Sequence, residues 1–221
     1  MKYKYITLDF GKVIAAPTTG NWDITPKFLE LIDINKIDKE KFKDLREKYE
    51  NILSEKVTNL EEEYNMFFRF YQSILKKFDI PIDVIKEIAY DRTYNSSKYI
   101  LYDNIHEELI NLKEKYILIL LTDNWPCVID YLKENNLYDY FEKIYISSIY
   151  SVEKKDKVFF DYPINELKIK PGEALFIDDN ESNLDIAREK GFEVLLMDRE
   201  NNVKESKYKI INNLSNIKEN E

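Results

Sequence analysis

The chain opens with a short apolar run and then changes to a helical pattern. Residues 3–8 are rich in β-forming side chains and favour a buried strand that ends at Asp9. From about residue 18 to residue 94, apolar residues recur three or four positions apart, which predicts helices. Within that stretch Thr58 and Glu61 have the spacing of a capping box, so we expect a long helix to begin there.

From about residue 96 short apolar runs alternate with amphipathic stretches. Strands and helices that alternate at this length predict a parallel sheet with right-handed crossover connections. The predicted strands cover residues 116–121, 143–147, 174–177 and 192–197, and the predicted helices cover residues 104–115, 157–167 and 182–190, with a further helix after Pro126.

The fold class that follows is α/β, with a Rossmann-like parallel sheet as the core. A helical insert interrupts the core directly after its first strand. We therefore predict a core domain made of residues 1–16 and 96–221, and an inserted helical domain over residues 17–95.

The composition narrows the class of protein further. A hydrophobic fraction of 44% with 14% aromatic residues excludes disorder as the main state. A net charge of −9 argues against binding to nucleic acid. One cysteine and one histidine exclude disulfide frameworks, multi-cysteine zinc sites and histidine-rich metal sites. No apolar run approaches the length of a membrane span, and no signal sequence precedes Asp9, so we expect a cytoplasmic protein without membrane attachment.

Polar side chains follow each of the predicted core strands. In a parallel sheet the carboxyl ends of the strands share one edge, so these side chains converge there. Any one of them would also suit an ordinary turn or helix cap, but four strand ends in a row carry complementary chemistry. Carboxylates that lie this close need a cation, and oxygen ligands alone favour Mg²⁺. The residues are Asp9; Thr122, Asp123 and Asn124; Ser147, Ser148 and Lys154; and Asp178 and Asp179.

The same segments resemble the four motifs of the haloacid dehalogenase-like (HAD) hydrolases, over residues 1–16 and 96–221. YITLDFGKVI is similar to the first motif, and LILLTDN to the second. SVEKKDKVFF is similar to the third, and ALFIDDNESNLDIAREKGF matches the fourth closely. The helical insert is similar to the small α-helical cap domain of this family.

The resemblance implies a role for each matching residue. Asp9 takes the position of the nucleophile that forms an aspartyl-phosphate. Thr122, with the backbone amides of Asp123 and Asn124, takes the position that binds phosphate oxygens. Lys154 takes the position of the lysine that offsets phosphate charge, although Lys155 stands where proline is usual.

The resemblance also implies a Mg²⁺ site. Its ligands would be Asp9, the main-chain carbonyl of Gly11, and the acidic pair Asp178 and Asp179. Within the pair, Asp179 is the expected direct ligand, and Asp178 is expected to hold a metal-bound water or Lys154. Asn183 is compatible both with holding such a water and with the first turn of a helix.

One position departs from the family's phosphatases. Gly11 stands where they carry a second aspartate as general acid, whose loss is worth about 10²–10⁴-fold in rate. We predict a Mg²⁺-dependent phosphatase that acts on a small phosphorylated metabolite, either a sugar phosphate or a nucleotide, as a monomer or weak homodimer. The alternatives are a haloacid dehalogenase-type hydrolase of carbon–halogen bonds, which also lacks the second aspartate, and a non-catalytic phospholigand-binding protein.

Overall fold

The computed structural model describes residues 3–217, which form two compact units. We call them the α/β unit, within residues 1–16, 101–124 and 132–221, and the helical unit, residues 17–100 and 125–131. The extreme ends of the predicted core domain, residues 1–2 and 218–221, lie outside the described residues.

The helical unit includes two segments that the sequence analysis places in the core, residues 96–100 and 125–131. The second segment follows an apolar strand, which is why it resembles a core element in sequence. In the structure its Trp125 packs edge-on against Phe67 with ring centroids 5.1 Å apart, and its Cys127 N–H donates to Glu63.

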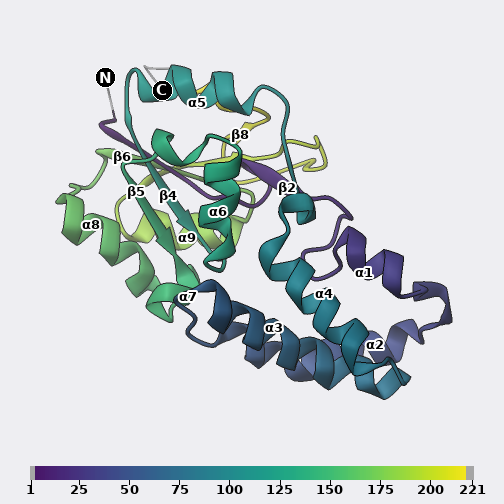
Figure 1. The fold of residues 1–221 in the computed structure, drawn as a ribbon. Coiled ribbons are helices and arrows are strands. Elements are labelled where there is room, and N and C mark those ends of the chain that lie inside the picture. Colours follow the sequence, from purple (N-terminus) through teal and green to yellow (C-terminus); the bar gives the residue numbers. More distant parts are fainter. Residues whose placement is uncertain (1–2, 218–221) are drawn as a thin grey trace. The chain divides into compact units, whose positions relative to one another are not determined.

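The α/β unit is built on a parallel sheet, as the sequence predicts. The described residues place six strands in the order β5-β4-β1-β6-β7-β8, and each neighbouring pair runs parallel. Figure 1 labels β5, β4, β6 and β8 of this sheet. β2 and β3 form a separate two-stranded sheet. The strands are β1 (Tyr5–Leu8), β2 (Ala15–Pro17), β3 (Tyr99–Leu101), β4 (Ile117–Thr122), β5 (Lys143–Ile146), β6 (Ala174–Asp178), β7 (Glu193–Met197) and β8 (Ile210–Ile211).

Both faces of the sheet are apolar, since β1, β4 and β6 are buried along almost their whole length. On one face Ile119 and Phe176 pack against Phe159, Phe160 and Leu184 from the helical connections. The helices that begin in this unit are α5 (Ile105–Lys113), α7 (Ser147–Tyr150), α8 (Asp161–Leu167) and α9 (Glu181–Glu189), and α6 (Cys127–Glu134) begins in the helical unit and ends here.

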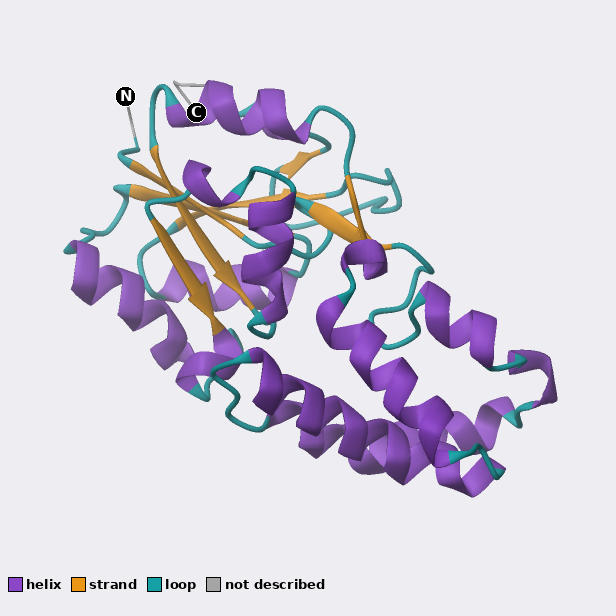
Figure 2. Cartoon of the chain, viewed as in Figure 1, coloured by secondary structure: helices purple, strands orange, loops and turns teal. Residues whose placement is uncertain are grey.

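The helical unit is built mainly of helices, drawn in purple in Figure 2. These helices bury a shared cluster of apolar side chains. Phe67 and Tyr71 of α3 lie in its core with Ile85 of α4. α3 begins one residue later than the predicted capping box implies: Asn59 is the N-cap, and its side chain accepts from the Glu62 N–H at 3.0 Å. The helices are α1 (Pro26–Leu31), α2 (Lys39–Tyr49), α3 (Leu60–Leu75) and α4 (Ile82–Tyr94). Among residues 3–217, no helix is long and apolar enough to cross a membrane.

Candidate active site

Three of the predicted carboxylates meet at the carboxyl edge of the sheet. Leu8 of β1 pairs with Ile177 of β6, so Asp9 and Asp178 follow in neighbouring positions. Oxygen atoms of Asp9, Asp178 and Asp179 lie within 4.8 Å of one another. We call these three residues the acid cluster.

Lys154 is the buried cation that contacts the acid cluster. Its Nζ lies 2.9 Å from Asp9 Oδ1 and 2.6 Å from Asp178 Oδ2, and its side chain is only 3% exposed. The contact with Asp9 is an ion pair without hydrogen-bond geometry, because Oδ1 of Asp9 is buried and accepts no hydrogen bond. Lys155 instead forms an exposed ion pair with Glu153. Lys154 is therefore the lysine of this segment that belongs to the site.

The two aspartates of the acidic pair differ in how many hydrogen bonds and ion pairs the protein makes to their carboxylate oxygens. Asp178 is completely buried and, besides Lys154, accepts from the Asn180 N–H at 2.8 Å and from Asn183 Nδ2 at 3.1 Å. Asp179 is 28% exposed and has an ion pair with Lys12, at 3.5 Å. The protein's own donors saturate Asp178, whereas Asp179 keeps capacity for a further cation.

The loop after β4 is tied to the other strand ends. Thr122 is the last residue of β4 and is buried. Asp123 Oδ1 accepts from the Lys154 N–H at 2.9 Å, and the Asn124 N–H donates to Ser147 Oγ at 3.1 Å. The loop is therefore held from two sides, and the Thr122 hydroxyl is carried by a rigid strand end.

Burial and mutual repulsion raise the pKa values of Asp9 and Asp179 in the acid cluster. Burial raises the pKa of Asp9 to about 7, although the Lys154 ammonium opposes that shift. Burial, followed by repulsion from Asp178, also raises the pKa of Asp179. For Lys154, burial acts to lower the pKa, but the carboxylates of Asp178 and Asp9 outweigh it, so the pKa lies well above its usual range.

These observations fit a bound divalent cation. The carboxylates outnumber the lysines that contact them, and one buried oxygen of Asp9 accepts no hydrogen bond. Oxygen-only ligands at this spacing suit a hard ion such as Mg²⁺.

Sequence reasoning missed Lys12 and Asn180. Lys12 follows Gly11 and adopts a left-handed conformation with φ of 53°, which brings its ammonium to Asp179. Asn180 caps α9 through its side chain while its own N–H donates to Asp178. An asparagine directly after the acidic pair was the available sign, because asparagine is a preferred N-cap.

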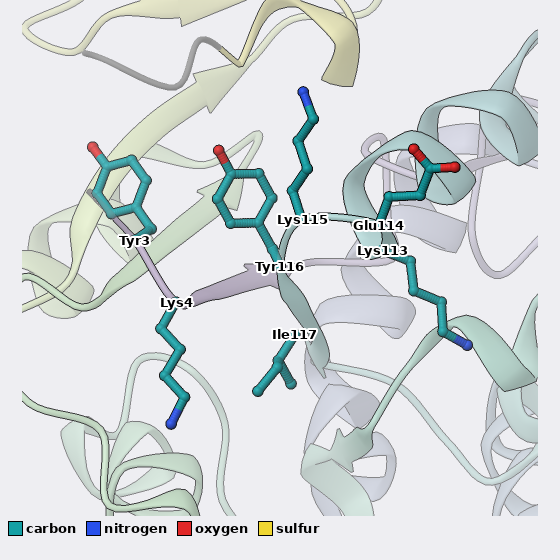
Figure 3. A pocket seen from close by; sticks show the side chains of 7 residues that line it. All are labelled: Tyr3, Lys4, Lys113, Glu114, Lys115, Tyr116 and Ile117. Carbon is teal, nitrogen blue, oxygen red and sulfur yellow. The ribbon is translucent and has the colours of Figure 1, made fainter. Parts of the chain in front are cut away.

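A pocket at the other end of the strands is separate from this site. It has a volume of about 440 Å³ and is lined by Tyr3, Lys4 and residues 113–117, at the start of β1 and β4 (Figure 3). Asp9 lies at the opposite end of β1, one strand length away. The lysine side chains in Figure 3 point in different directions, so their ammonium groups do not converge on one ligand.

Comparison with known proteins points to one family. Residues 23–197 match the model of the family described as haloacid dehalogenase-like hydrolase. A curated relative, D-ribitol-5-phosphate phosphatase from Bacteroides thetaiotaomicron, is 33% identical over 92 residues. That alignment spans 38% of this chain and 45% of the relative, so it covers less than half of the relative's length.

Solved structures show the same fold over nearly the whole chain. The HAD-hydrolase YfnB from Bacillus subtilis, bound to magnesium, aligns with a TM-score of 0.67 and 16% identity, covering 97% of this chain and 96% of that one. L-2-haloacid dehalogenase from Xanthobacter autotrophicus aligns with a TM-score of 0.68 and 11% identity, covering 96% of each chain. With the family match over most of the sequence and the predicted motifs at one sheet edge, the chain belongs to the haloacid dehalogenase-like hydrolase family.

Proposed function

We propose that this chain is a Mg²⁺-dependent phosphatase that hydrolyses a small phosphomonoester through an aspartyl-phosphate on Asp9. The observation that carries the proposal is the acid cluster, in which Asp178 and Asp179 accompany Asp9 within 4.8 Å. Such an excess of carboxylate is suited to a divalent cation and, through it, to a phosphoryl group.

Each residue around the cation would have a distinct task. Asp9, Asp179 and the carbonyl of Gly11 would hold Mg²⁺ directly. Asp178 would hold Lys154 in place rather than bind the cation directly, because its own oxygens already accept protein hydrogen bonds. When bound, Mg²⁺ neutralises charge on the phosphoryl oxygens and aligns them for attack.

The chain's own groups then supply the chemistry. A carboxylate oxygen of Asp9 attacks phosphorus, the bond to the ester oxygen breaks, and the leaving alkoxide takes a proton from water, since Gly11 offers no side-chain acid. A water molecule next attacks phosphorus, which releases inorganic phosphate and regenerates Asp9. Lys154 and the Thr122 hydroxyl would bind the phosphoryl oxygens with the amides of Asp123 and Asn124.

The substrate class to test first is a phosphorylated sugar or polyol. This choice comes from the curated relative, whose name specifies D-ribitol 5-phosphate. Nucleoside monophosphates form the second class. The helical unit would serve as the cap that selects between them.

The test is hydrolysis of an aryl phosphate, with Mg²⁺ and with EDTA. An aryl leaving group needs little protonation, so Gly11 does not mask activity. We expect turnover that requires Mg²⁺ and that Asp9→Asn lowers by at least about 10³-fold. Asp44→Asn, which changes an exposed carboxylate on α2, is the matched control and should keep full activity.

A second candidate, hydrolysis of a carbon–halogen bond, is favoured by Gly11, because the family's dehalogenases also lack the second aspartate. It predicts halide release from a 2-haloacid that persists in EDTA and is lost in Asp9→Asn. No turnover in either assay, together with Mg²⁺-dependent binding of phosphate, would replace both with a phospholigand-binding protein.

A further inference from the structure

Three segments of the α/β unit meet at the guanidinium of Arg199. This arginine is the second residue after β7. Its Nε and Nη2 donate to the Val13 carbonyl at 3.1 and 2.9 Å. Its Nη1 and Nη2 also donate to the two carboxylate oxygens of Glu108 on α5, at 3.1 and 2.7 Å. Both side chains are at most 5% exposed, so water does not weaken the contacts.

The carbonyl that Arg199 binds belongs to the turn that follows the nucleophile. We call residues 10–15 the nucleophile loop. It closes on itself through the Ile14 N–H, which donates to Phe10 O at 2.9 Å, and the Lys12 N–H, which donates to Ala15 O at 2.7 Å. Lys12 holds a left-handed φ of 53°, which is unfavourable for a residue with a Cβ atom.

Support from outside the loop offsets that local cost. Besides Arg199, the Tyr102 N–H donates to Ile14 O at 3.2 Å, and the Tyr102 ring lies 5.2 Å from the Arg199 guanidinium. Two consecutive carbonyls of the nucleophile loop are thus fixed by residues distant in the sequence.

The chemistry of the pair suits a geometric role. Glu108 balances the charge of Arg199, so the pair adds little field to the acid cluster. The planar guanidinium donates two N–H groups to one carbonyl and two to one carboxylate, a pattern that the single ammonium of lysine cannot reproduce.

We propose that Arg199 and Glu108 form a positioning clamp for the nucleophile loop. The clamp fixes the main chain between Asp9 and Val13, and with it the spacing between the Asp9 carboxylate and the Gly11 carbonyl that a divalent cation requires. Arg199 is a positioning residue, since it contacts Val13, Glu108 and Tyr102 and acts on the acid cluster only through the nucleophile loop. The link to metal affinity rests on the proposed function.

The experiment measures Mg²⁺ binding by calorimetry on the full chain, separately from turnover. We expect Arg199→Met to raise the Mg²⁺ dissociation constant by about 10-fold or more, the range typical of residues that orient metal ligands. Arg199→Lys should raise the dissociation constant by a similar factor. Because it keeps the positive charge, it serves as the test variant if the methionine variant does not fold. Glu108→Gln should shift the dissociation constant in the same direction. Arg188→Met, at an exposed arginine of α9, is the matched control and should bind as the wild type does.

The outcomes separate the clamp from the proposed function. A folded Arg199→Lys or Arg199→Met protein with wild-type Mg²⁺ affinity, even if less stable towards urea, would overturn the clamp and leave Arg199 as a support of the fold only. Wild-type protein that binds Mg²⁺ tightly but hydrolyses no phosphomonoester would overturn the proposed function alone. If 5 mM guanidinium chloride restores Mg²⁺ affinity to Arg199→Ala, the geometric role is supported directly.

Discussion

Each unit of the molecule buries a cluster of charged side chains, and the two clusters are compensated in different ways. In the α/β unit, three carboxylates of the acid cluster face Lys154 and Lys12, and the excess charge is negative. In the helical unit, the carboxylates of Glu63 and Asp91 lie among the cations of Arg92 and Lys98, so the formal charges balance. We call that second group, Glu63, Asp91, Arg92, Lys98 and Cys127, the arginine cluster.

Aromatic rings compensate the arginine cluster. The Arg92 guanidinium carbon lies 4.3 Å from the ring centroid of Phe67 and 5.2 Å from that of Trp125. Glu63 Oε2 accepts from the Cys127 N–H at 2.8 Å. Among the residues that the structure describes, Nε and Nη2 of Arg92 and Oε1 of Glu63 have no hydrogen-bond partner.

An excess of negative charge distinguishes the acid cluster from the arginine cluster. In the arginine cluster, carboxylates and cations are equal in number, and ring faces also attract the guanidinium of Arg92. A surplus of carboxylate has no comparable apolar partner, and beyond hydrogen-bond donors a cation or a proton relieves it. We therefore infer that the acid cluster binds a ligand and that the arginine cluster stabilises the helical unit.

The largest expected effect comes from removing the cation of the acid cluster. Lys154→Met leaves Asp9 and Asp178 buried without their ammonium, so the free energy of unfolding in EDTA should fall by about 3–5 kcal/mol. Urea denaturation measures it. Lys155→Met, at the exposed neighbour, should change it by no more than about 0.5 kcal/mol. Equal losses in both variants would show that the acid cluster does not depend on its lysine.

A smaller loss should follow removal of the cation from the arginine cluster. Burial already raises the pKa of Glu63, and Lys98 remains, so Arg92→Met leaves a carboxyl group that can take up a proton. We expect the free energy of unfolding to fall by about 1–3 kcal/mol. Arg69→Met, which removes an exposed ion pair with Glu55 on the same unit, should cost less than about 1 kcal/mol. A loss that exceeds that of Lys154→Met would reverse the comparison.

Sequence patterns predicted the sheet and the edge where the acid cluster lies, because both follow from local order. Asp9 and Asp178 each come directly after an apolar strand, and a parallel sheet brings such positions together. Lys154, which the resemblance to the third motif indicates, donates to Asp178 at 2.6 Å, and Asn183, for which two roles stayed open, donates to Asp178 at 3.1 Å.

Long-range polar contacts could not be predicted in this way. Glu63 lies in the acidic first turn of α3, where the helix dipole alone explains a glutamate, yet its oxygen accepts from Cys127, 64 residues away. Arg199 and Glu108 are separated by 91 residues and sit in segments without a recognisable motif. Such pairs depend on tertiary packing, which neither periodicity nor spacing encodes.

The smallest predicted effect is a gain in stability from removing the nucleophile's charge. Burial raises the pKa of Asp9 from 3.8 to about 7, so the folded chain keeps a proton that the unfolded chain has released. The Asp9 carboxyl therefore contributes less to the free energy of unfolding of the wild type as the pH rises from about 4 to about 7. Asparagine at position 9 does not titrate, so this cost disappears in Asp9→Asn. The substitution also removes the ion pair with Lys154, which makes the net gain small. In EDTA, Asp9→Asn should gain about 1 kcal/mol above pH 7, and the gain should fade toward pH 4.

Urea denaturation at several pH values measures this gain, and Asp44→Asn again serves as the exposed control. Saturating Mg²⁺ should remove the difference or reverse it, because the cation relieves the same repulsion in the wild type alone. A gain that is independent of both pH and Mg²⁺ would mean that the Asp9 carboxylate is not destabilised where it lies. The contrast between an acid cluster that needs a cation and an arginine cluster that does not would then fail at its central residue.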